Sequence, residues 1–465
     1  MGKPSSPLSA ELPPLIMGTA TFNSQYNPDP YALPTTALVH SALSAGIRAF
    51  DTSPYYGPAE ELLGRALSTT FVRDNYPRDC YKLLTKVGRL AESSFDYSPA
   101  WIRKSVRRSL TRLATSYLDV VYCHDVEFVT PEEVLSAVRE LRRVRDTEGT
   151  IRYVGISGYP VDVLCSLAEM VLEKTGEPLD VVMSYANFTV QNTRLATEGL
   201  PRLLAAGVDV VPNASPLGMG LLRCEGVPIG GMGDFHPAPD GLRSAVHAAS
   251  KWAAERGEKL EVISIRYALE SWLREGSRVG ALGAPLAPST TENMGFASVA
   301  NVGVGQRLGV SVMGVSNLEE LEETLRVWRS IVDGLDSLVE EPLDPVDAEI
   351  HEDSADCIAS SGNHDKQPHS SIISEDPASL SSVMTPGDGI TDAQWSRMRR
   401  KQILKLVKGA REVIGEWMNY TWDSPAKGFV NVLPPDHHVV SDTEGDRDDT
   451  ALLTPPLDVK DREPA

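Results

Sequence analysis

The sequence is poor in cysteine, and this shortage argues against two classes of site. Its five cysteines are scattered along 465 residues, and no two of them form a CxxC pair. Structural zinc sites and disulfide frameworks both depend on characteristic cysteine spacings. We therefore expect free thiols in a reducing compartment and no metal site.

Long hydrophobic runs are also missing. The amino-terminal stretch MGKPSSPLSAELPPLIMG contains no apolar run of signal-peptide length, and no other segment reaches the length needed to cross a bilayer. The glycine-rich residues 294–315 come nearest, but Gln306 and Arg307 interrupt them. We expect a cytoplasmic protein with no membrane anchor.

Positive charge is the third scarce property. Lys and Arg total 44 against 64 Asp and Glu, which gives a net charge of −20. Residues 336–388 alone contribute −12, through 13 acidic side chains and one lysine. Because such a surface repels phosphate backbones and anionic lipids, we expect no nucleic-acid and no membrane partner, and favour a small neutral substrate.

Short β-branched or apolar runs alternate with amphipathic stretches from residue 14 to about 215. Ser98-Pro99 and Thr130-Pro131 each offer a helix N-cap followed by proline at the first helical position. Strands are predicted at 15–21, 47–51, 81–87, 118–124, 151–157, 179–185 and 208–214, with helices at 37–46, 98–113, 130–149 and 160–174. This alternation is typical of a parallel α/β fold.

Further elements bring the strand count to eight. Helical spacing occurs at 241–256 and 258–275, an eighth strand is predicted at 310–315, and a helix at 317–334. A (β/α)8 TIM barrel needs roughly 250 residues when it has no insertions. We therefore assign residues 14–334 to one α/β barrel.

Four segments depart from this plan. Residues 277–308 are rich in Gly, Ala and Ser and are interpreted as a flexible insertion before the eighth strand. Residues 335–390 are acidic and poor in aromatics, which predicts a disordered linker. Residues 391–425 have apolar residues at helical spacing, so we expect an amphipathic helix that docks on the barrel, followed by a disordered tail over 426–465.

Polar residues at strand ends are the candidates for chemistry, because barrels of this kind carry their active sites at the carboxyl ends of the strands. Asp51 ends the second predicted strand, Lys86 lies at the end of the third, and His124 ends the fourth. Tyr56 follows Asp51 by five residues, in the loop DTSPYYG. Each residue alone has an ordinary structural explanation, but the four together predict a catalytic group.

The chemistry of these four residues is coherent. The ammonium of Lys86 would lower the pKa of the Tyr56 phenol, and Asp51 would hold Lys86 in place. His124 would donate a hydrogen bond to a substrate oxygen or relay a proton with Tyr56. Hydride transfer would require a nicotinamide cofactor, because no amino-acid side chain performs it.

The sequence resembles the aldo-keto reductase superfamily over about residues 15–334, apart from the insertion. The resemblance rests on GIRAFDTSPYYGPAEELLGRAL, LLTKVGR, SYLDVVYCHDVEF, IRYVGISGYP and NASPLGMGLL. It is strongest to the branch that contains fungal NAD-specific D-arabinose 1-dehydrogenase and plant L-galactose dehydrogenase. Membership implies a barrel enzyme that oxidises the anomeric carbon of a small, neutral cyclic sugar to a lactone.

The resemblance also implies residue roles. Tyr56 would be the general acid/base, Lys86 and Asp51 its electrostatic support, and His124 the donor that orients the substrate. Ser157 would contact the nicotinamide carboxamide. The other cofactor contacts that we expect are Ser215, Leu217 and Gly218 at the pyrophosphate, together with Gly18, Thr19, Gly158, Ser184, Gly314, Ser316, Glu320 and Glu323.

Three positions depart from the family pattern in the nicotinamide pocket. Gly158 and Met183 stand where many members have Asn and Gln, and Ala214 replaces an aromatic residue. The region after the eighth strand favours NAD, although NADP stays possible: Ser316 stands where NADP-dependent relatives often carry a cation, and acidic residues surround it. Glutamates such as Glu320 and Glu323 would repel a 2′-phosphate.

Two alternative functions stay open at this point. The first is an NADPH-dependent aldehyde or ketone reductase with the same fold and catalytic group. The second is a non-enzymatic, redox-sensing regulatory subunit, for which the acidic linker would provide a binding segment. The sequence does not fix the oligomeric state, and we expect a monomer.

Overall fold

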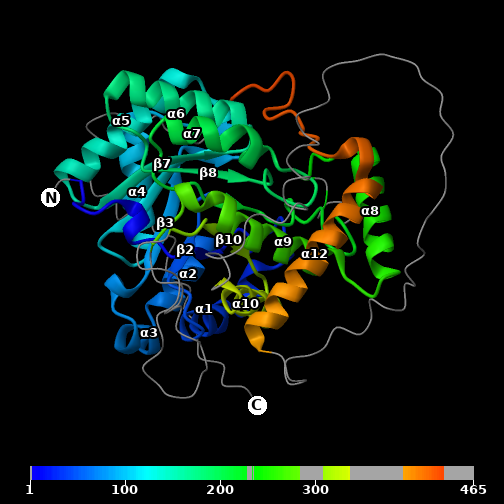
Figure 1. The fold of residues 1–465 in the computed structure, drawn as a ribbon. Coiled ribbons are helices and arrows are strands. Elements are labelled where there is room, and N and C mark those ends of the chain that lie inside the picture. Colours follow the sequence, from blue (N-terminus) through cyan, green and yellow to red (C-terminus); the bar gives the residue numbers. More distant parts are fainter. Residues whose placement is uncertain (1–2, 228–232, 234, 283–306, 336–390, 434–465) are drawn as a thin grey trace.

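Eight parallel strands close into a barrel in the computed structural model, which describes residues 3–227, 233, 235–282, 307–335 and 391–433 (Figure 1). Their order around the barrel is β1-β10-β9-β8-β7-β6-β3-β2. The strands are β1 (Leu15–Gly18), β2 (Ala49–Asp51), β3 (Lys82–Val87), β6 (Leu118–His124), β7 (Ile151–Gly158), β8 (Val181–Tyr185), β9 (Asn213–Ala214) and β10 (Ser311–Gly314). The predicted TIM barrel is confirmed.

Side chains fill the inside of the barrel. Ile16, Leu84 and Tyr153 are buried there, in one cluster with Leu8 and Leu12 from the amino-terminal segment. The Tyr153 hydroxyl donates to the Ser6 carbonyl at 2.9 Å. The amino-terminal segment therefore closes the end of the barrel at which the strands begin.

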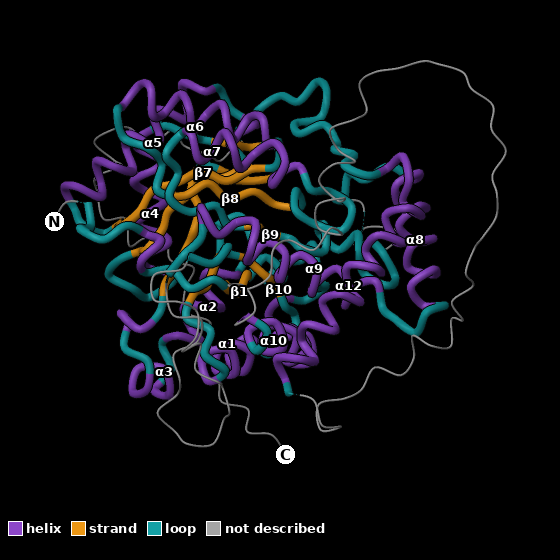
Figure 2. The backbone as a smooth tube through the Cα atoms, viewed as in Figure 1, coloured by secondary structure: helices purple, strands orange, loops and turns teal. Residues whose placement is uncertain are grey.

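A ring of helices surrounds the strands (Figure 2). Ser98 and Thr130 accept hydrogen bonds from backbone N–H groups of the helices that follow them, as predicted, and Thr130 forms a capping box with Glu133. The helices are α1 (Thr35–Ser44), α2 (Ala59–Leu67), α3 (Thr70–Asn75), α4 (Pro99–Arg112), α5 (Pro131–Thr147), α6 (Val161–Thr175), α7 (Leu200–Ala205), α8 (Asp240–Ala254), α9 (Leu260–Glu275) and α10 (Leu318–Val332). A short hairpin, β4 (Arg89–Ala91) and β5 (Ser94–Phe95), follows β3.

Two predicted segments of the barrel differ most from the structure in their limits. The strand expected at 208–214 is regular only at β9, because Pro212 has no N–H to donate and the Val211 N–H donates to Val279 instead. The insertion expected at 277–308 is ordered at both ends, where Ala281 pairs with Leu308. Residues 283–306 lie outside the described part of the chain.

Helix α12 (Asp392–Ile414) packs against α8 and α9, as its orange ribbon shows in Figure 1. Ile403, Leu406 and Val407 are buried in this contact and join the main hydrophobic core. Gly409 lies against the Trp252 ring so closely that an added Cβ would be 2.3 Å from it. The predicted helix through residue 425 is too long, because α12 ends at Ile414 and Gly415 takes a positive φ.

The segment after α12 runs over the barrel and corrects the prediction of a disordered tail from 426 onward. Gln191 donates to the carbonyls of Trp417 and Tyr420 at 2.7 and 3.1 Å, and the Val432 N–H donates to Ser93 at 3.0 Å. Residues 426–433 therefore belong to the folded body. The predicted acidic linker lies outside the described residues, except Leu335 at its start, and so does the tail from 434.

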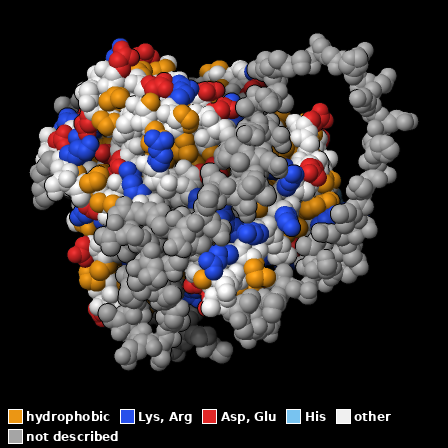
Figure 3. All heavy atoms as spheres, in the orientation of Figure 1, with side chains coloured by type: hydrophobic (Ala, Val, Ile, Leu, Met, Phe, Trp, Pro, Cys, Tyr) orange, Lys and Arg blue, Asp and Glu red, His pale blue; other side chains and the backbone are white. Residues whose placement is uncertain are grey.

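The visible surface of the described residues is mixed in character. Acidic and basic side chains are interspersed on the face drawn in Figure 3, with hydrophobic side chains between them. No helix among the described residues combines the length and apolarity needed to span a bilayer.

Candidate active site

The four predicted catalytic residues line one cavity of about 630 Å³. Asp51 ends β2, Lys86 lies one residue before the end of β3, and His124 ends β6. Tyr56 comes from the loop after β2. Parallel strands bring their carboxyl ends to one rim, which is why residues up to 73 positions apart meet here.

Lys86 and Asp51 form a buried ion pair. The Lys86 Nζ lies 2.6 Å from Asp51 Oδ1 and donates to the Thr52 carbonyl at 2.9 Å, and the Lys86 side chain is only 1% exposed. Burial raises the pKa of Asp51, and the neighbouring Lys86 offsets part of this rise. Removing either side chain would leave the other as a buried, unpaired charge. The ion pair with Asp51 therefore fixes the position of the Lys86 ammonium.

The pKa of the Tyr56 phenol differs from the prediction. Lys86 Nζ lies 4.8 Å from the centroid of the Tyr56 ring, yet the pKa of Tyr56 is raised well above its ordinary value. Burial is the main cause, and the charges of Asp51 and Asp125 add to it. The expectation that Lys86 lowers this pKa is therefore wrong here, because Asp51 balances the charge of Lys86 and burial penalises the phenolate. Tyr56 holds its proton at neutral pH.

His124 is an uncharged imidazole in contact with two aromatic rings. Its ring lies 5.7 Å from that of Tyr56 and 5.9 Å from that of Tyr55, both edge to face. Burial lowers the pKa of His124 to about 3. His124 therefore acts near neutral pH as a hydrogen-bonding group and not as a cation.

A second polar group beside His124 was not predicted from the sequence. Arg89 forms an ion pair with Asp125, donates to the Tyr55 hydroxyl at 3.0 Å, and stacks 3.8 Å from the Tyr55 ring centroid. All three side chains line the cavity. The sequence held a signal for two of them, since Arg89 lies within LLTKVGR and Asp125 directly follows His124 in CHDVEF.

Eight of the twelve predicted cofactor residues line the same cavity: Gly18, Ser157, Ser215, Leu217, Gly314, Ser316, Glu320 and Glu323. The other four are not part of the cavity lining. Thr19 donates to the Asp51 carbonyl at 3.1 Å, and Ser184 accepts from Asn187 at 2.9 Å. Gly218 offers its carbonyl to His236, and Gly158 faces Glu127. Direct contact of these four with a cofactor stays a prediction.

The cavity fits a nicotinamide dinucleotide. In the turn after β9, Ser215, Gly218, Met219 and Gly220 have φ values between 56° and 94°. The Gly218 and Gly220 N–H groups close this turn on the Ser215 and Leu217 carbonyls, so that Ser215, Met219 and Gly220 line the cavity where a pyrophosphate would lie. At the far end, Glu320 accepts from the Ser316 N–H at 2.7 Å, next to Glu323, so this end of the cavity is acidic.

The segment after α12 covers part of the cavity. Trp422, Ser424 and Phe429 line it, and the Trp422 ring stacks on Tyr159 at 4.4 Å between centroids. Ser424 donates to the buried Glu127 at 3.0 Å. No motif in the sequence indicated that residues this far along the chain reach the site.

The buried Glu127 carboxyl group explains why glycine stands at residue 158, where many family members have asparagine. Burial raises the pKa of Glu127 to about 8, and the charge of Asp125 adds to the shift. A Cβ at residue 158 would lie 2.4 Å from Glu127 Oε2. Glycine at 158 therefore makes room for this carboxyl group, and the asparagine of other family members would collide with it.

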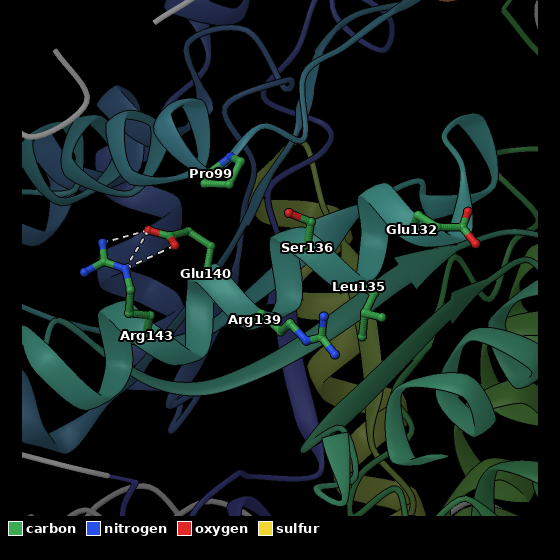
Figure 4. A pocket seen from close by; sticks show the side chains of 7 residues that line it. All are labelled: Pro99, Glu132, Leu135, Ser136, Arg139, Glu140 and Arg143. Carbon is green, nitrogen blue, oxygen red and sulfur yellow. Dashed lines mark hydrogen bonds and ion pairs between the residues drawn. The ribbon is translucent and has the colours of Figure 1, made fainter. Parts of the chain in front are cut away.

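A second hollow, of about 430 Å³, lies between α4 and α5 on the outside of the barrel (Figure 4). Two of its charged groups pair with each other: Arg143 Nη2 lies 2.7 Å from Glu140 Oε1, which Arg103 Nη1 also approaches to 2.8 Å. It holds none of the predicted catalytic residues. Across the described ranges, no group of three or more His, Cys, Asp or Glu side chains is placed to hold a metal.

Comparison with known proteins agrees with the motifs. The sequence profile of the Aldo/keto reductase family matches residues 14–334. D-arabinose 1-dehydrogenase of Saccharomyces cerevisiae is 42% identical over 269 residues, which cover 57% of this chain and 78% of that protein. L-galactose dehydrogenase of Arabidopsis thaliana is 35% identical over 298 residues, which cover 63% of this chain and 86% of that protein. A solved glycerol dehydrogenase from Gluconobacter oxydans is 20% identical, covers 73% of this chain and 97% of its own, and has a TM-score of 0.47.

Proposed function

From the premise that this chain belongs to the Aldo/keto reductase family, and is therefore an NAD(P)-dependent oxidoreductase, we propose that it oxidises an aldose. The substrate is a cyclic sugar of the D-arabinose or L-galactose type, and the product is the aldonolactone. The identity to two aldose dehydrogenases supports this substrate class.

The observation that carries the proposal is the composition of one cavity. Tyr56, Lys86, Asp51 and His124 line the same space as the Arg89–Asp125 pair. A sugar ring carries several hydroxyl groups, which need donors and acceptors when they leave water. The ionised pair and the Tyr55 hydroxyl supply both, whereas a simple apolar aldehyde would make no use of these groups.

The chain's own residues handle the proton. In its deprotonated form, Tyr56 accepts the proton of the anomeric hydroxyl as the carbon is oxidised, and the protonated phenol returns that proton in the reverse direction. His124 donates a hydrogen bond to the same oxygen and so orients the reacting carbon. The Lys86 ammonium, held by Asp51 4.8 Å from the Tyr56 ring centroid, balances the Asp51 carboxylate, which would otherwise repel the negative charge that develops on Tyr56. A nicotinamide bound in this cavity would supply the hydride acceptor.

We propose NAD as the preferred cofactor, because Glu320 and Glu323 would repel a 2′-phosphate next to Ser316. Replacing Ser316 with arginine should shift binding toward NADP+, since it adds a cationic partner for that phosphate. The nearby glutamates should limit the gain. Fluorescence titration gives the ratio of the two dissociation constants, with Ser316→Gln as the control of similar length without charge. An unchanged ratio in the arginine variant would place the adenosine end elsewhere.

Asp125 should set the preference for polyhydroxylated substrates. In the Asp125→Asn variant we expect KM for aldoses to rise about tenfold or more, because a hydrogen bond to a charged group is worth about 1.5–3 kcal/mol. KM for simple aldehydes in the reductive direction should change little, which makes the second substrate an internal control. Equal changes for both substrates would contradict a role in recognising hydroxyl groups.

The overall proposal is tested with a substrate panel. Turnover of D-arabinose, L-galactose, L-fucose and simple aldehydes is measured in both directions with both cofactors. Oxidation of an aldose with NAD+ should be the fastest reaction. If NADPH-dependent reduction of simple aldehydes is faster than every aldose oxidation, the protein is a carbonyl reductase and the proposal fails.

A further inference from the structure

The buried hydroxyl of Ser53 connects the loop after β2 to His124. Ser53 Oγ accepts from the Tyr55 N–H at 3.1 Å and lies 3.1 Å from His124 Nδ1. A serine hydroxyl has one proton and two acceptor sites. Its oxygen already receives the Tyr55 N–H, so its own proton is available for a bond to the imidazole.

The opposite nitrogen of the ring faces a carboxylate. His124 Nε2 lies 3.5 Å from Asp125 Oδ2. Burial by itself would raise the pKa of Asp125, but the charges of its neighbours, including the Arg89 guanidinium paired with it, outweigh burial, and the pKa lies below its ordinary value. An ionised carboxylate only accepts, so a bare Nε2 would place two lone pairs against each other.

These two contacts determine where the single proton of the neutral ring resides. The proton belongs on Nε2, facing Asp125, and Nδ1 is then a bare acceptor for the Ser53 hydroxyl. The Tyr55 and Tyr56 rings fix the plane of the imidazole. His124 is therefore in contact with the side chains of residues 53, 55 and 56, which all belong to one loop.

We propose that Ser53 is a positioning residue that holds His124 in the tautomer with its proton on Nε2. This inference rests on the proposed function for its consequence: the 3.5 Å between His124 Nε2 and Asp125 Oδ2 is too long for a strong hydrogen bond, so the Nε2–H can donate to the substrate oxygen beside Tyr56. Without the serine hydroxyl, the proton could move to Nδ1, and Nε2 would meet the substrate oxygen as an acceptor.

The test is the nitrogen-15 spectrum of the full-length protein with labelled histidine, in which bare and protonated ring nitrogens differ in chemical shift. The His124 signals, among nine histidines, are assigned by comparison with His124→Gln. The unmodified protein should show His124 with Nε2 protonated. Ser53→Ala should show a mixture of tautomers or Nδ1 protonated. Ser53→Cys, which keeps a weak donor, should be intermediate.

A buried serine outside the cavity provides the matched control. Ser105 lies in α4, is 2% exposed, and does not line the cavity. Ser105→Ala should leave both the His124 signals and turnover unchanged. In Ser53→Ala, kcat for aldose oxidation should fall by on the order of 10–100-fold, in the range found when groups that orient a functional histidine are removed, while KM changes little.

The spectrum decides the proposal independently of turnover. A protonated Nδ1 in the unmodified protein, or an unchanged His124 signal in Ser53→Ala, would overturn it, even if kcat fell. If the unmodified protein oxidises no aldose, the proposed function fails, while the tautomer of His124 is still decided by the same spectra.

Discussion

Replacing Tyr56 with phenylalanine should lower turnover by about 10²–10⁴-fold, the usual contribution of a positioned acid/base group. The substitution removes only the hydroxyl that exchanges a proton with the substrate. The ring, which packs edge to face on His124 at 5.7 Å, is retained. The affinity for NAD+, measured by fluorescence titration, should therefore stay nearly unchanged.

Tyr55 provides the comparison for this result. It comes from the same loop and lines the same cavity, and its hydroxyl accepts from Arg89. Tyr55→Phe should lower kcat far less than Tyr56→Phe, because the lost hydroxyl does not exchange a proton with the substrate. Turnover of the Tyr56 variant within a few-fold of the unmodified enzyme would exclude its role as acid/base.

The pH profile gives a second readout for Tyr56. Burial raises the pKa of Tyr56 well above its ordinary value, so the phenol is protonated at neutral pH. Oxidation needs an unprotonated acceptor, so its rate should rise as the solution becomes more alkaline. Reduction needs the protonated phenol and should be favoured at lower pH. In the Tyr56→Phe variant, neither the rise of the oxidation rate with pH nor the preference of reduction for lower pH should remain.

The second large effect concerns stability. Ile403 and Leu406 on α12 are 2% and 6% exposed, and they pack into the main core. Each change to alanine should cost about 2–5 kcal/mol, because it removes buried methyl groups and leaves a cavity. A typical protein is stable by only about 5–15 kcal/mol, so the double variant should unfold at a much lower urea concentration.

Met398 on the same helix is the control, because it is 46% exposed. Met398→Ala should change the free energy of unfolding by no more than about 0.5 kcal/mol. Deletion of residues 391–425 should destabilise the barrel in the same way as the core variants. Deletion of residues 336–390, with a short linker in their place, should not. Equal stability of the two deletion variants would mean that α12 contributes nothing to the fold.

The sequence by itself determined the barrel and the position of its catalytic group. Short β-branched or apolar runs and helical patterns are local, and they alternate regularly from residue 15 onward. Once eight parallel strands close into a barrel, their carboxyl ends meet at one rim, so Asp51, Lys86 and His124 must come together. Connectivity alone is sufficient for that conclusion.

The electrostatics of the site depended on burial, which no local pattern encodes. The sequence predicted a lowered pKa for Tyr56 from the presence of Lys86. In the folded chain, Asp51 balances Lys86 at 2.6 Å, and burial raises the pKa instead. The sign of such a shift depends on which charges lie nearby and how much water is excluded, and both are properties of the packed interior.

Only the tertiary structure decided what covers the cavity. Ser94 and Val432 are 338 positions apart and form a hydrogen bond, and Trp422 and Phe429 line the cavity beyond a linker that carries no periodic pattern. Likewise, Arg89, Asp125 and Tyr55 come from the segments that follow three different barrel strands. Contacts of this kind are stabilised by side chains that meet after folding, and no spacing along the chain specifies them.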